Sequence, residues 1–251
     1  MAISNPYPIE TLHSRGVIEL RGDGILPFLH NILTCSVDNL NHGDLTYGAL
    51  LSPQGKILHD VFIYNNVGSV FLDCAATGRD ELITKLKLYR LRAKFEILPR
   101  DDLYVQVGAD VTADPRLAGL GGRRIVSAVT QGGSAQYEMR RYALGIADSS
   151  EIGSGKLFPH EANFDLMNAV DFNKGCYIGQ EVVSRMQHRG TLKSRILPVT
   201  FENDPLTDDN RVVEILGRIG NKGLALVRLD RWVEQGAPLG LRILKPDWIK
   251  L

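Results

Sequence analysis

The most constraining feature of the sequence is a change of pattern near Gly190. Downstream of it, short apolar segments alternate with turns rich in Gly, Asp and Asn, and helical periodicity is lost. Alternation at such short spacing is typical of an all-β sandwich or barrel. We therefore expect residues 191–251 to form a separate antiparallel β domain, built from segments 196–199, 212–215, 224–227 and 239–243.

Residues 1–190 mix strand and helix patterns, which predicts an α+β fold for this part. Segments 48–51, 56–64 and 69–74 are separated by two stretches with turn-forming residues, 52–55 and 65–68, so they predict an antiparallel meander. The other predicted elements are a strand over 17–21, a helix with Pro27 in its first turn, an amphipathic helix over 80–91, strands over 95–97 and 104–107, and more β structure after a loop at 119–124 and on through Tyr142.

Composition excludes several classes of protein. Lys plus Arg equals Asp plus Glu at 29 each, so no overall field would hold nucleic acid or an anionic membrane. Three cysteines without CxxC spacing do not suit a secreted disulfide scaffold or a zinc site. The first ten residues lack the pattern of a secretory signal, and we find no apolar run long enough for a membrane span. These features predict a protein of the cytoplasm or an equivalent matrix.

The most informative segment is 173–185, which reads Asn-Lys-Gly-Cys-Tyr-Ile-Gly-Gln-Glu-Val-Val-Ser-Arg. It predicts a glycine-containing loop that enters an amphipathic helix. Cys176 would then precede a helix N-terminus, with Lys174 nearby, and both features favour thiolate over thiol. Such a thiolate suits a nucleophile, a redox thiol or a ligand for iron. The competing interpretation of a lone cysteine is a small buried apolar residue.

This segment closely resembles the Lys-Gly-Cys-Tyr-x-Gly-Gln-Glu signature of the YgfZ family, folate-binding proteins related to the aminomethyltransferase of the glycine cleavage system. Arg185 and Arg189-Gly190 match the arginines that follow the signature in that family. Weaker similarity extends over most of the chain in the same order, through segments 20–34, 88–94, 158–163 and 223–228.

The resemblance implies an architecture and a role. The implied fold is an α+β, GcvT-like cloverleaf: two interleaved α+β subdomains over 1–190, one of them ferredoxin-like, and a C-terminal antiparallel β-barrel domain over 191–251. Tetrahydrofolate is expected in a central funnel. The implied role is assembly or repair of iron–sulfur clusters, chiefly [4Fe-4S], in client enzymes, with an indirect effect on tRNA thiomethylation. Activity would rest on Cys176, and the implied partners are client enzymes and cluster assembly proteins.

A folate funnel needs a carboxylate for the pterin, apolar or aromatic walls and a basic residue for the glutamate tail. Glu161 is our candidate for the pterin, although a carboxylate favoured by a helix N-terminus is the competing interpretation. Arg185 and Arg189 are candidates for the tail, although such basic runs are more often solvated. The signature residues also assigned to the folate site are Lys174, Gly175, Tyr177, Gly179, Gln180 and Glu181.

Two other functions stay open at this point. Aminomethyltransferases carry Asp-Asp-Leu where this chain has His59-Asp60-Val61, so Asp60 is the candidate catalytic group for one-carbon transfer, or else a solvated hairpin residue. A direct tRNA-binding module is disfavoured by the zero net charge. A resident metal is not expected beyond transient iron or a cluster on Cys176, because the six histidines form no metal-binding pair.

Overall fold

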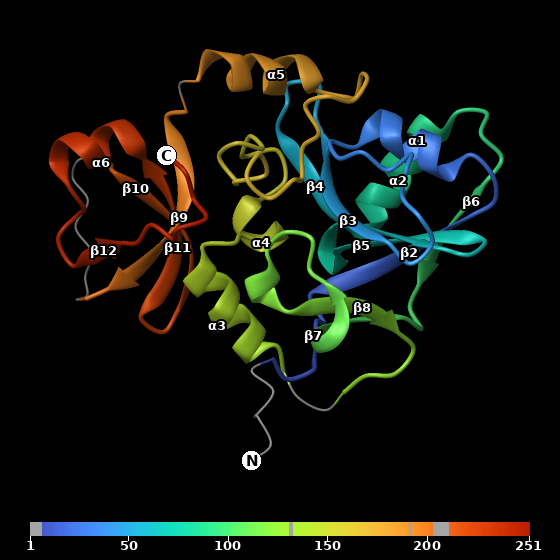
Figure 1. The fold of residues 1–251 in the computed structure, drawn as a ribbon, viewed down its shortest axis with the longest axis horizontal. Helices are drawn as coiled ribbons and strands as arrows, with labels where there is room; N and C mark the ends of the chain where they lie inside the picture. Colours follow the sequence, from blue (N-terminus) through green and yellow to red (C-terminus); the bar gives the residue numbers. More distant parts are fainter. Residues whose placement is uncertain (1–6, 131–132, 191, 203–210) are drawn as a thin grey trace.

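The computed structural model describes residues 7–130, 133–190, 192–202 and 211–251, with the side chains of Asp110 and Arg189 left undescribed. Its largest sheet is antiparallel and has the strand order β3-β4-β5-β2-β6 (Figure 1). This sheet contains the predicted meander. Its strands and associated helices are β2 (Arg15–Arg21), α1 (Ile25–Ile32), β3 (Leu45–Leu51), β4 (Ile57–Asn66), β5 (Ser69–Ala75), η1 (Ala76–Gly78), α2 (Arg79–Arg90) and β6 (Glu96–Arg100).

Both faces of this sheet are buried, which is why its strands lack a clean polar and apolar alternation. Ile18 and Leu20 of β2 pack with α1 and α2 in one apolar cluster. Val17, which directly precedes Ile18 in β2, and Phe62 of β4 belong to a second cluster on the other face. The sheet is therefore a central layer, with α1 and α2 on one side and the second subdomain on the other.

The second sheet has the order β1-β7-β8, and its strands are β1 (Glu10–Thr11), β7 (Tyr104–Ala113) and β8 (Gly122–Val126). Strand β1 comes before the first sheet in the sequence, and β7 comes after it, yet these two strands pair with each other. The two subdomains therefore interleave along the chain. The helices η2 (Ala118–Leu120), α3 (Ala135–Leu144) and α4 (Ser149–Ile152) belong to this part. The prediction of β structure through Tyr142 is wrong here, because the chain forms α3 instead.

The third sheet contains only strands after residue 193 and has the order β10-β11-β9-β12. The strands are β9 (Ser194–Phe201), β10 (Val213–Ile219), β11 (Lys222–Arg228) and β12 (Leu241–Ile243), and they have an apolar cluster of their own. The expected absence of helix is wrong, because α6 (Leu229–Gln235) follows β11. Helix α5 (Gln180–Arg189) leads from the core to this sheet across the top of Figure 1. The α+β architecture predicted from the sequence is confirmed.

Within the described residues, the helices are all too short or too polar to cross a bilayer.

Candidate functional site

The three cysteines of the chain, all in described parts, differ sharply in exposure. Cys35 and Cys74 are buried, and burial raises the pKa of each thiol to about 12. They are therefore protonated and inert at neutral pH. Cys176 is exposed, in the loop before α5. The structure thus rejects the interpretation of Cys176 as a small buried apolar residue and leaves it as the one accessible thiol.

Lys174 fixes this loop to the end of α1. Its ammonium donates to the backbone oxygens of Leu33 and Cys35, each at 2.8 Å, and also to that of His30. These carbonyls lie at and just beyond the C-terminus of α1, where partial negative charge collects. Burial lowers the pKa of Lys174. All three ammonium protons are used in this anchor, so the expected support of a Cys176 thiolate by Lys174 is replaced by a positioning role.

The rest of the signature holds the loop from its other end. Tyr177 is buried in the core, and its ring centroid lies 5.2 Å from the Lys174 ammonium. Gln180 folds back to donate to the backbone oxygens of Lys174 at 3.4 Å and Gly175 at 3.3 Å. Gly179 adopts a positive φ of 81° and packs against the β3–β4 turn. The flanking residues are thus used for structure, and Cys176 is presented outward.

Gly179 should tolerate no side chain. A Cβ there would lie 2.6 Å from the backbone oxygen of Ser52, and the positive φ adds strain. We expect Gly179→Ala to lower the free energy of unfolding by about 2–5 kcal/mol, the sum of a left-handed backbone and an overpacked contact. Urea unfolding measures this. Gly175→Ala is the matched control, because a Cβ there meets nothing within 4 Å; equal losses in both variants would contradict the packing argument.

Other predicted folate residues are engaged elsewhere. Glu181 and Arg185 form an ion pair of 2.7 Å on the exposed side of α5. Glu161 accepts a hydrogen bond of 2.9 Å from the backbone N–H of Phe158 and lies 3.8 Å from the Lys56 ammonium. Glu161 thus caps a turn. The helix N-terminus of the competing interpretation is not formed here, because residues 159–168 form turns. The Arg189 side chain lies outside the described residues. Of the described side chains, Glu161, Glu181 and Arg185 all have their contacts away from Cys176.

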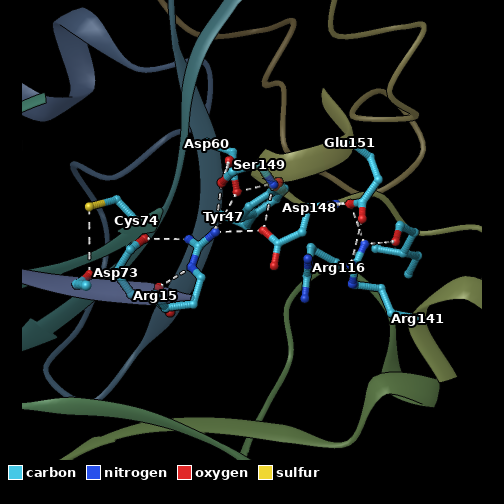
Figure 2. Close-up of polar contacts among 12 residues, drawn as sticks. Arg15, Tyr47, Asp60, Asp73, Cys74, Arg116, Arg141, Asp148, Ser149 and Glu151 are labelled. Carbon is cyan, nitrogen blue, oxygen red and sulfur yellow. Dashed lines mark hydrogen bonds and ion pairs between the residues drawn. The ribbon is translucent and has the colours of Figure 1, made fainter. Parts of the chain in front are cut away.

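Asp60 is neither a hairpin residue in solvent nor a free base. It is 2% exposed, and its carboxylate accepts from Arg15 Nη1 at 3.2 Å, from the Tyr47 hydroxyl at 3.2 Å and from the Ser149 hydroxyl (Figure 2). The interpretation as a solvated residue is wrong because the register of β4 places Asp60 opposite Ala49, on the buried face. A carboxylate with three donors is fixed in place.

Arg15 is the centre of a buried ionic network that the motif analysis missed. Its guanidinium donates to Asp73 Oδ1 at 2.6 Å and to Asp148 Oδ1 at 2.7 Å (Figure 2). Arg123, fully buried, donates to the other oxygen of Asp73 at 2.6 Å and stacks 3.8 Å from the centroid of Phe62. Burial alone would raise the pKa of Asp148, but the charges of Arg15 and the neighbouring arginines lower it overall.

No cluster of three His, Cys, Asp or Glu side chains in the described ranges could hold a metal ion. A metal bound at Cys176 therefore needs ligands from outside those residues.

Comparison with known proteins gives these features a context. Residues 193–251 match the family described as CAF17, C-terminal beta-barrel domain. The chain is 29% identical to the mitochondrial iron–sulfur cluster assembly factor IBA57 homolog of Pyricularia oryzae, over 95% of this chain and 84% of that protein. It is 28% identical to IBA57 of Homo sapiens, over 94% and 84% of the two chains. The chain is thus similar to IBA57 proteins over most of its length.

Within this group, coverage varies. The chain is 30% identical to the IBA57 homolog of Chaetomium globosum but spans 61% of its length. Among solved structures, the glycine cleavage system aminomethyltransferase T of Bartonella henselae superposes with a TM-score of 0.73 at 13% identity, over 96% of this chain and 86% of that one. The GcvT-like fold predicted from the resemblance is confirmed, and the relatives named above are IBA57 proteins.

The comparisons correct the predicted location. The IBA57 relatives described above are mitochondrial proteins, which points to mitochondria and contradicts the expectation of a cytoplasmic protein.

Proposed function

We propose that this chain is an iron–sulfur cluster assembly factor that acts through Cys176. The observation that carries the proposal is the presentation of this thiol. Lys174, Tyr177 and Gly179 hold the loop by packed contacts, while the cysteine itself is free and exposed. The IBA57 relatives, which are iron–sulfur cluster assembly factors by name, support the same role.

The chemistry of a single thiolate limits how Cys176 can act. A cluster normally takes four cysteine thiolates, so one residue supplies a quarter of the ligands. The remaining ligands must come from a cluster donor, a client enzyme or a small thiol. A site of this kind suits transfer better than storage, because the cluster leaves when a client offers a fuller ligand set. We therefore propose that Cys176 holds iron or a cluster in transit, chiefly toward [4Fe-4S] enzymes.

Binding of tetrahydrofolate is a separate question. The side chains predicted to bind it make other contacts in this structure, so they do not form a folate site. Gln180 closes the loop, Glu161 caps a turn, and Glu181 pairs with Arg185 on the surface. Because they do not converge on one cavity, we derive no chemical step through folate. Anaerobic titration of the chain with tetrahydrofolate tests this point, and saturable binding would show that these residues rearrange.

Aminomethyl transfer gains no support from Asp60. A general base must be free to move and take a proton from its substrate. The three donors around Asp60 instead tie its carboxylate to Arg15, Tyr47 and Ser149. We therefore propose a structural role for Asp60. An effect on tRNA thiomethylation would arise indirectly, through a client enzyme that contains a cluster.

The proposal is tested in cells that lack this protein. Rescue with the wild-type chain should restore the activity of [4Fe-4S] enzymes, and Cys176→Ser should fail to restore it at equal protein level. Stability should change by less than about 0.5 kcal/mol, because the residue is exposed. Cys74→Ala is the matched control: it removes a buried thiol and should still rescue. Full rescue by Cys176→Ser would refute the proposed function.

A further inference from the structure

A cavity of about 230 Å³ lies at the start of β4, away from the Cys176 loop. It is bounded by His59 and Asp60 of β4, by Gly78 and Glu81 at the start of α2, and by Ser149 of α4. Because α2 and α4 come from different subdomains, the cavity is built where the two subdomains meet. It is smaller than the roughly 300–1,000 Å³ of pockets for drug-sized ligands, so it suits a small molecule.

The lining of the cavity is rich in hydrogen-bond acceptors. Each of its two carboxylates also has a cationic partner that does not line the cavity: Arg15 lies 3.2 Å from Asp60, and Lys85 lies 3.4 Å from Glu81 Oε1. Asp60 and Glu81 contribute carboxylates, and Ser149 and Thr77 contribute hydroxyls. Lysine and arginine are absent from the residues that line it, all of which belong to the described part of the chain. A carboxylate offers about four acceptor positions, and the donors from Arg15, Tyr47 and Ser149 use three of those on Asp60. One position is left for a ligand.

His59 shows that a partner is missing from this cavity. Its side chain is 5% exposed, and its buried Nε2 has no hydrogen-bond partner among the described residues. The nearest charged atom, Glu81 Oε1, is 3.8 Å away, too far for a hydrogen bond. Burial lowers the pKa of His59, so the ring is neutral at neutral pH and keeps one nitrogen as an acceptor. Buried polar atoms are normally satisfied, which makes this nitrogen an indicator of a bound group.

We propose that this cavity binds a small guanidinium or amidinium compound. A planar cation of this type carries several N–H donors in fixed directions. It can donate to Asp60, to the Glu81 oxygen that does not face Lys85 and to the free nitrogen of His59 together. Ile57 and Ile152 form apolar walls against which a flat group packs. The absence of a metal-binding cluster among described residues favours an organic cation over a metal ion.

Calorimetric titration of the full chain with methylguanidine tests the proposal. Saturable binding is expected, together with a shift of the His59 Nε2 resonance in ¹H–¹⁵N NMR spectra. Glu81→Gln should weaken binding by about tenfold or more, because it removes a charge-assisted contact. Glu81 is exposed at the cavity edge, so the variant should fold normally. The matched control Glu96→Gln removes an exposed carboxylate from β6, outside the cavity, and should bind like wild type.

Three outcomes would overturn the proposal. The first is no saturable heat and no His59 shift with the wild-type chain. The second is equal affinity in Glu81→Gln and Glu96→Gln, which would place any binding elsewhere. The third is displacement of methylguanidine by tetrahydrofolate, which would assign the cavity to folate. Cys176→Ser should bind methylguanidine like wild type, so this test is independent of the iron–sulfur proposal.

Discussion

Arg15→Met is expected to lower the free energy of unfolding by about 3–5 kcal/mol. The Arg15 side chain is 1% exposed and pairs with three carboxylates, those of Asp60, Asp73 and Asp148. Methionine has similar length but no charge, so the variant leaves buried carboxylates with fewer donors. Removing one partner of a buried ion pair costs more than the pair contributes, because the other charge stays desolvated. Urea unfolding at pH 7 measures the change.

A matched control separates this effect from the loss of any surface arginine. Arg92 is exposed, and Arg92→Met should change the unfolding free energy by less than about 0.5 kcal/mol. A loss below 1 kcal/mol in Arg15→Met would contradict the account of the network. A double variant, Arg15→Met with Asp73→Asn, should lose less than the sum of the single losses, because the two residues are in contact.

Lys174→Met is expected to cost about 1.5–3 kcal/mol and to abolish rescue of client enzymes. The ammonium satisfies backbone oxygens of His30, Leu33 and Cys35, and methionine leaves them without that donor. The loop would then lose its attachment to α1, and Cys176 would lose its fixed position. Urea unfolding and the rescue assay measure the two effects.

Lys87→Met is the control for Lys174, because Lys87 is exposed on α2 and should be replaceable without effect. Rescue by Lys174→Met at normal protein level would show that the anchor does not matter for function. Faster alkylation of Cys176 with little loss of stability would point to a loop that moves but still presents its thiol.

Much of the fold follows from local sequence chemistry. The meander is predicted because turn-forming residues at 52–55 and 65–68 separate three apolar segments. In the structure these segments form β3, β4 and β5. Helix α3 is missed because its buried face contains Arg141 beside Tyr137 and Tyr142, and a charge at a core position breaks the apolar pattern. Helix α6 is missed because it is seven residues long and buries none of them.

One part of the candidate site could be predicted from the sequence and another part could not. The Cys176 loop is recognisable because its residues are contiguous in the sequence. The ionic network is not, because Arg15 pairs with residues 45 to 133 positions away. A charge such as Asp73 within an apolar strand signals a buried partner but does not identify it. The surroundings of His59 are equally non-local, since α2 and α4 reach β4 only in the folded chain.

We propose above that the exposed thiol of Cys176 takes part in cluster transfer. The most direct test is anaerobic reconstitution of a purified apo-client with a cluster donor, in which [4Fe-4S] formation is measured by absorbance and electron paramagnetic resonance. The wild-type chain should raise the yield of cluster, and Cys176→Ser should leave it at the level seen without the protein. An equal rise with Cys176→Ser would contradict this role and leave the exposed thiol without a function in cluster transfer.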